Sequence, residues 1–171
     1  FRIDIHGLAL GWNRITVVFK DVYGVYGSDT ITIYYEDIYP PNVDIINPPD
    51  GSIFTDPEIV VDVYADDGWG TPYWGSGIIK VSWTHTWEGG GESDDYIFDK
   101  PYDYVTMHIP IILEIGENVI TVTAQDAAGN EPYYPDSITL ILLEPLVADA
   151  DGPYSGGINE KIQFYGSASG G

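Results

Sequence analysis

Residues 116–143 read GENVITVTAQDAAGNEPYYPDSITLILL, and this stretch decides the fold. After Asn118 the residues alternate between two faces, with Ile120, Val122 and Ala124 on one and Val119, Thr121 and Thr123 on the other. A period of two with β-branched residues is typical of a half-buried strand. Ser137–Leu143 repeats the alternation, so the stretch predicts two strands joined by a connection that contains prolines.

The connection begins with Asp126-Ala127-Ala128-Gly129-Asn130. An aspartate side chain can accept a hydrogen bond from the backbone two residues on, and glycine and asparagine tolerate a positive φ. This pentapeptide therefore predicts a tight turn directly after the first strand.

The same pattern occurs earlier in the chain. Gly11–Val17, GWNRITV, matches Gly116–Val122, GENVITV, at an offset of 105 residues (116 − 11). Further matches are Asp21 with Asp126, Gly24 with Gly129 and, after a two-residue slip, Asp29–Ile33 with Asp136–Leu140. A repeat of about 100 residues has the size of an immunoglobulin-like sandwich and is too long for a solenoid unit. We interpret it as an internal duplication.

Composition supports an all-β fold. The chain is 44% hydrophobic, is rich in Val, Ile, Tyr and Thr, and has 20 glycines and 12 prolines to make turns. No stretch shows sustained helical periodicity. We expect tandem Ig-like β-sandwich modules, one complete and two partial. Their predicted limits are 1–39, 40–144 and 145–171.

Individual strands are predicted within these modules. Residues 1–7, FRIDIHG, alternate like a strand, and Trp83 lies in mid-strand as a core tryptophan would. Residues 88–95, EGGGESDD, suggest a flexible acidic loop before a short edge strand at 96–98. The next strand, 102–109, is expected to end at Pro110.

The charge balance of the chain disfavours one class of partner and favours another. With 27 acidic and 6 basic residues, the net charge is −21. Nucleic acid is disfavoured as a partner, because neutralising phosphates needs Lys and Arg. An acidic surface favours solubility and cation binding.

The chain has no cysteine for a disulfide framework, and no apolar run is long enough to insert in a membrane.

Two resemblances follow from the motifs. Residues 145–171 contain ADADGPY, GG, INE and IQFYGSAS, and resemble the start of a polycystic-kidney-disease-type (PKD) domain, a β-sandwich of many microbial surface proteins. Residues 40–144 contain PPNVDIINPPDGS, SGIIKVSW and GENVITVTAQDAAGN, and resemble bacterial and archaeal Ig-like surface domains. The resemblance implies an extracellular or cell-surface location.

Both ends of the chain are then expected to stop inside a module, as they would in a portion of a longer tandem-domain protein. An alternative is that the N-terminal and C-terminal strands fold together, within one chain or between neighbouring subunits, so that the partners are other copies of the chain or neighbouring modules. Such strand exchange would satisfy exposed sheet edges and would build a filament.

Calcium is the first candidate ligand, because it binds six to eight oxygens of carboxylates and amides. The candidate ligands are Asp66, Asp67, Asp126 and Asn130, with two further acidic pairs near module junctions, Glu36–Asp37 and Asp149–Asp151. The alternative is that these residues only cap turns, which aspartate does in many proteins.

Glycan is the second candidate ligand. Trp69, Tyr73 and Trp74 share one loop beside Asp66 and Asp67, and aromatic platforms near carboxylates can hold sugars. The alternative is that the loop packs these rings on its own sandwich or on a neighbouring module.

No catalytic constellation is visible. The three histidines, His6, His85 and His108, show no metal or triad spacing, and Ser76, Ser82 and Ser93 lie in no nucleophile elbow. Two functions stay open. The first is a structural module of an S-layer, stalk or filament. The second is an adhesive or spacer module of a secreted protease or glycosidase.

Overall fold

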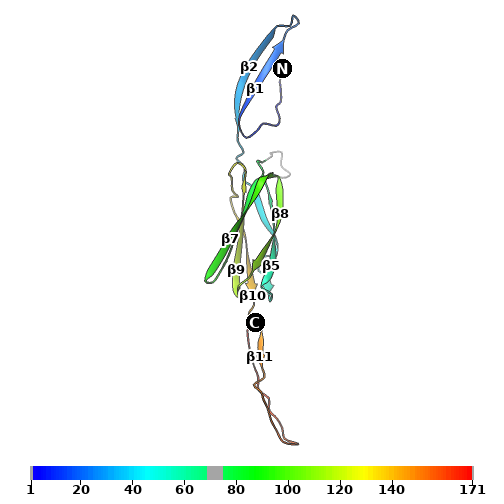
Figure 1. Ribbon diagram of the computed structural model, residues 1–171, viewed down its shortest axis with the longest axis vertical. Coiled ribbons are helices and arrows are strands. Elements are labelled where there is room, and N and C mark those ends of the chain that lie inside the picture. Colours follow the sequence, from blue (N-terminus) through cyan, green and yellow to red (C-terminus); the bar gives the residue numbers. More distant parts are fainter. Residues whose placement is uncertain (1, 69–74, 171) are drawn as a thin grey trace.

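The computed structural model describes residues 2–68 and 75–170, and in this part of the chain every regular element is a strand. Figure 1 shows three parts in a row. A hairpin of β1 (Gly11–Lys20) and β2 (Tyr26–Tyr35) lies beyond one end of a central sandwich. A short pair, β11 (Val147–Asp149) and β12 (Ser167–Ser169), lies beyond the other end. The expected all-β class is confirmed.

The central sandwich contains eight strands that form two sheets. They are β3 (Asn42–Asn47), β4 (Ile53–Phe54), β5 (Glu58–Asp66), β6 (Ile78–Trp87), β7 (Gly90–Tyr102), β8 (Tyr104–Ile112), β9 (Gly116–Asp126) and β10 (Asp136–Leu142). One sheet has the order β4-β10-β9-β6-β7 and the other has the order β3-β5-β8. The stretch predicted as two strands is β9 and β10, which pair antiparallel.

Alternate residues of the two sheets form one hydrophobic core. The predicted inward face of β9 is confirmed, because Ile120, Val122 and Ala124 are at most 1% exposed. Trp83 lies in the core as expected. The other core residues are Val43, Val61, Val63, Ala65, Ile78, Val81, Val105, Ile109, Ile111, Leu113, Ile138, Leu140 and Leu142.

The two hairpins of the repeat share the same hydrogen bonds. Asn118 Nδ2 donates to the carbonyl oxygens of Glu114 and Gly116, and Asn13 Nδ2 donates to those of Ala9 and Gly11. At the turns, Asp126 Oδ1 accepts from the backbone N–H of Asn130, and Asp21 Oδ1 accepts from that of Val25. Each bond in one hairpin joins residues that are as far apart in sequence as those of the corresponding bond in the other hairpin. β1 and β2 are therefore the structural counterparts of β9 and β10.

Three strand predictions are wrong. Residues 2–7 form no strand, and no other segment pairs with them among the described residues. Residues 90–95 belong to the long strand β7 rather than to a flexible loop, because β6 offers them a free edge over most of its length. β8 continues through Pro110. Proline has no backbone N–H to give to a neighbouring strand, and an edge strand such as β8 tolerates it because one side of the strand has no partner.

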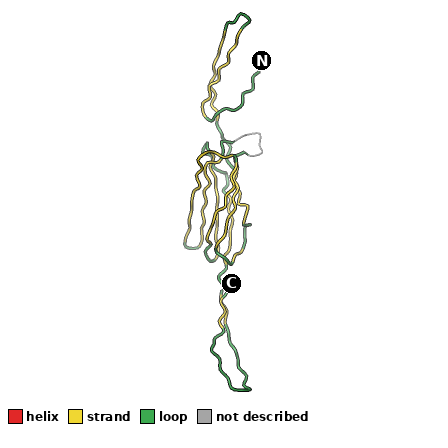
Figure 2. Tube along the Cα trace, turned by 45° about the vertical axis from the view of Figure 1, so that its right-hand side comes forward, coloured by secondary structure: helices red, strands yellow, loops and turns green. Residues whose placement is uncertain are grey.

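The C-terminal part is mostly loop between its two short strands, as Figure 2 shows. The Tyr154 hydroxyl group holds it together, since it donates to the carbonyl of Tyr165 at 2.6 Å and accepts from the Tyr165 N–H at 2.9 Å. The structure alone does not identify this part as a PKD domain. In the described part of the chain, no helix has the length and apolar character needed to cross a membrane.

Candidate metal centre

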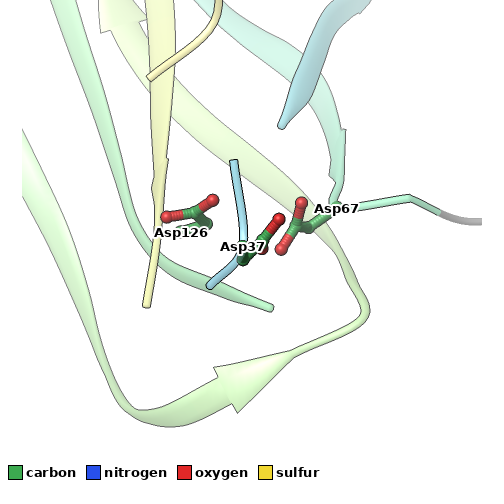
Figure 3. A group of neighbouring side chains, drawn as sticks. All are labelled: Asp37, Asp67 and Asp126. Carbon is green, nitrogen blue, oxygen red and sulfur yellow. The ribbon is translucent and has the colours of Figure 1, made fainter. Parts of the chain in front are cut away.

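Three aspartates from separate segments meet where the linker after β2 reaches the sandwich. Asp37 lies in the linker, Asp67 follows β5 and Asp126 ends β9 (Figure 3). One carboxylate oxygen from each lies within 4.8 Å of the others. All three are buried, with exposed fractions of 6%, 5% and 0%. Three carboxylates are thus concentrated in a region with little access to water.

Backbone hydrogen bonds hold each carboxylate in place. Asp37 accepts from the N–H groups of Tyr39 (3.1 Å) and Ser76 (2.6 Å), and Asp67 Oδ2 accepts from the N–H of Gly77 (2.6 Å). At Gly75 the backbone passes so close to the Asp67 carboxylate that a Cβ atom would overlap it. The 75–77 segment therefore wraps tightly around two of the three aspartates.

Asn130 connects the linker to the turn after β9. Its Nδ2 donates to Asp126 Oδ2 at 2.8 Å, to the Asp37 carbonyl at 3.1 Å and to the Tyr39 carbonyl at 3.4 Å. The side chain of Asn130 thus donates hydrogen bonds to one carboxylate of the cluster and to the backbone of the linker. It positions Asp126 and the linker.

The structure brings together only part of the predicted ligand set. Asp67 and Asp126 are in the cluster, whereas Asp66 is outside it and is paired within the β3-β5-β8 sheet. Asp37 also belongs to the cluster, although from the sequence it was expected only in a separate acidic pair with Glu36 near a module junction. Asp149 accepts from the N–H of Asp151 in the C-terminal part and belongs to a local turn. Trp69, Tyr73 and Trp74, the predicted glycan site, lie outside the described residues.

Among the described residues, no ion pair with a basic side chain neutralises the cluster. Within residues 2–68 and 75–170, the ion pairs join Arg2 to Asp4, His85 to Glu92 and His108 to Asp62, and none includes Asp37, Asp67 or Asp126. Burial, and to a smaller degree the nearby Asp37 and Asp126, raises the pKa of the Asp67 carboxyl group from 3.8 to about 6, against an opposing hydrogen bond from the Gly77 N–H. A buried carboxylate with this pKa is costly to ionise without a cation.

This pKa predicts a pH dependence of stability in metal-free buffer. Between pH 4 and 6 the folded chain keeps the Asp67 proton while the unfolded chain releases it, so the Asp67 contribution to the free energy of unfolding should fall by about 1–2 kcal/mol as the pH rises. Urea denaturation across this pH range will measure the effect as the difference between the wild type and Asp67→Asn. A difference that is constant with pH would contradict the assignment.

Comparisons with known proteins find no matching family model and no similar curated protein. Among solved structures, the chain is similar to one described as "Structures of Clostridium thermocellum CbhA fibronectin(III)-like modules". The likeness has a TM-score of 0.43 and 19% identity, and it covers 81% of this chain and 65% of that chain. A similarity at this level supports no statement about function. The assignment of an all-β sandwich depends instead on the strands described above.

Proposed function

We propose that this chain is a non-catalytic structural segment of a larger extracellular protein, in which Ig-like sandwiches follow one another as a stalk, surface layer or filament. One observation carries the proposal. The β1–β2 hairpin repeats the hydrogen bonds of β9–β10, but no other described strand covers it as strands cover β9–β10 in the complete sandwich.

The uncovered face of the hairpin is apolar where its counterpart is buried. Ile15 corresponds to Ile120 and lies opposite Ile31, which corresponds to Ile138. Ile138 is 6% exposed, whereas Ile31 is 51% exposed. Phe19 on the same face of β1 is also half exposed. An apolar face at positions that form a core elsewhere in the same chain is best explained by a second core of the same kind.

The occupant of this face is therefore the rest of a sandwich with the pattern of residues 40–110. In the complete sandwich, β6 pairs with β9 along most of its length. The equivalent edge of β1 is open, since β1 pairs only with β2 among the described strands. The partner strands come from a neighbouring module of the same protein or from another copy, and the edge N–H and C=O groups of β1 would pair with them.

The arrangement of the parts supports an extended array. The hairpin and the β11–β12 pair lie beyond opposite ends of the sandwich (Figure 1). A net charge of −21 makes separate copies repel, so association requires specific strand contacts rather than unspecific adhesion.

The internal repeat allows a direct test. In a chimeric chain, a second copy of residues 40–110 is placed before His6, because Ile111 corresponds to His6 at the offset of 105 residues. We expect this chain to form a second sandwich around β1 and β2. Amide hydrogen exchange of β1 should slow by at least about tenfold, since its edge N–H groups become paired and buried.

Val17 provides the matched control in the same chimera. It corresponds to Val122, which is fully buried, so Val17→Asp would place a carboxylate in the new core. Slow exchange should then be lost in β1 and kept in β9. If β1 exchanges equally fast in the chimera and in the natural chain, the hairpin does not accept such strands and the proposal is wrong.

A further inference from the structure

We propose that Asp37, Asp67 and Asp126 together bind one divalent cation of the calcium type, and that this ion fastens the linker to the central sandwich. The inference goes beyond the structural role proposed above, which requires no metal. It would give the junction between two modules a stiffness that depends on the cation.

The geometry fits a single ion. Two oxygens bound to one calcium ion at about 2.4 Å can lie at most about 4.8 Å apart. One oxygen from each of the three aspartates satisfies this limit. All three donors are carboxylate oxygens, and this hard donor set suits Ca²⁺, Mg²⁺ or Mn²⁺ better than zinc or copper. Calcium tolerates irregular ligand geometry better than magnesium, which suits ligands from three separate segments.

The second observation is an orphaned oxygen. Asp67 Oδ1 is buried and has no hydrogen-bond partner in the described structure, although Asp67 Oδ2 accepts from Gly77. The Asp67 side chain is 5% exposed, and Figure 3 shows its carboxylate beside that of Asp37. A buried acceptor without a donor is costly, and a cation would satisfy it.

Turn capping explains only part of the cluster. Asp126 caps the turn that ends at Asn130, but Asp21 caps the equivalent turn in the first hairpin by the same bond to Val25. In the described structure Asp21 belongs to no acidic group of this kind. The cap therefore needs one aspartate, and the approach of Asp37 and Asp67 has another cause.

The position of Asp37 gives the ion its mechanical consequence. Asp67 and Asp126 belong to the sandwich, whereas Asp37 lies between the hairpin and β3. Without a cation, three buried carboxylates repel each other and favour release of the linker. A bound ion reverses this repulsion and holds the linker against the 75–77 segment and the turn after β9.

The test is calorimetric titration of the full chain with CaCl₂ after removal of metals. We expect saturable binding of one ion per chain within the affinity range of extracellular calcium modules, a Kd of about 10⁻³ M or tighter. Calcium should also raise the melting temperature of the sandwich. Amide exchange of residues 36–39 should slow on addition of calcium, because the linker becomes attached.

Asp37→Asn is the decisive variant, because Asp37 lies outside the strands of the sandwich and the change preserves shape. We expect the affinity for calcium to fall by at least about tenfold, since one charged ligand is lost. Asp21→Asn removes the same kind of residue from the equivalent turn of the first hairpin and should leave the affinity unchanged.

Two results would overturn the assignment. One is the lack of saturable binding up to about 10 mM calcium, well above the Kd range of extracellular modules. The other is an equal affinity for calcium in the wild type and Asp37→Asn. The heat measured in the titration would then come from unspecific binding of calcium to the acidic surface. A failure of the chimeric chain above would leave the cation site untouched, since its three ligands all lie in residues 37–126.

Discussion

Replacing Asn118 with leucine is expected to lower the free energy of unfolding of the central sandwich by about 3 kcal/mol. Asn118 is fully buried. Its Oδ1 accepts from the Glu114 N–H at 2.9 Å and lies 2.8 Å from His85 Nε2. Its Nδ2 donates to the carbonyls of Glu114 and Gly116 at 2.7 and 3.0 Å. Leucine fills a similar volume but leaves the buried His85 ring nitrogen and the part-buried backbone groups of Glu114 and Gly116 without these partners.

Asn13→Leu is the matched control for Asn118→Leu. Asn13 makes the equivalent bonds to Ala9 and Gly11, but it lies in the open hairpin, where water can replace them. We expect the sandwich transition to stay within about 0.5 kcal/mol of the wild type. Urea denaturation followed by near-UV circular dichroism will measure both variants. If both variants lose the same free energy of unfolding, the hydrogen bonds themselves, rather than their burial, account for the loss.

Ile120→Ala should have the other large effect, a loss of about 3 kcal/mol in the free energy of unfolding. Ile120 is 1% exposed and faces the core between the two sheets. The substitution removes buried methyl and methylene groups and leaves a cavity in close-packed surroundings. The melting temperature should fall with it, as differential scanning calorimetry can measure.

Ile15→Ala makes the same chemical change at the equivalent position of the first hairpin. Among the described strands, β2 is the one partner of the Ile15 strand, and no second sheet covers Ile15. We expect a change below about 0.5 kcal/mol in the transition of the sandwich. In the chimera with a second copy of residues 40–110, Ile15→Ala should become costly, because a new core would cover it. An unchanged small effect in the chimera would count against the proposed second sandwich.

The candidate metal site shows how far sequence reasoning can reach. Asn130 was predicted as an oxygen ligand, but its Nδ2 donates to Asp126 Oδ2, so it positions a candidate ligand instead. Asp67 and Asp126 were predictable, because acidic residues in turns can supply oxygen ligands to calcium. The placement of Asp37 was not, because it is 30 residues from Asp67 and 89 from Asp126 (67 − 37 and 126 − 37). Only the approach of the linker to the end of the sandwich brings them together. A signal was nevertheless present, since Asp37 lies three residues before the predicted start of the complete module at residue 40 (40 − 37).

The sequence by itself determined the strands with strict alternation, the turn at 126–130 and the repeat that relates the two hairpins. These are local properties, because a period of two and the φ preferences of glycine and asparagine act over a few residues. The tertiary structure decided which strand edges were available. It made residues 90–95 a strand along the edge of β6 and left residues 2–7 unpaired. It also decided that one of two corresponding hairpins is buried and the other is open, because burial depends on which other strands are present to cover a face.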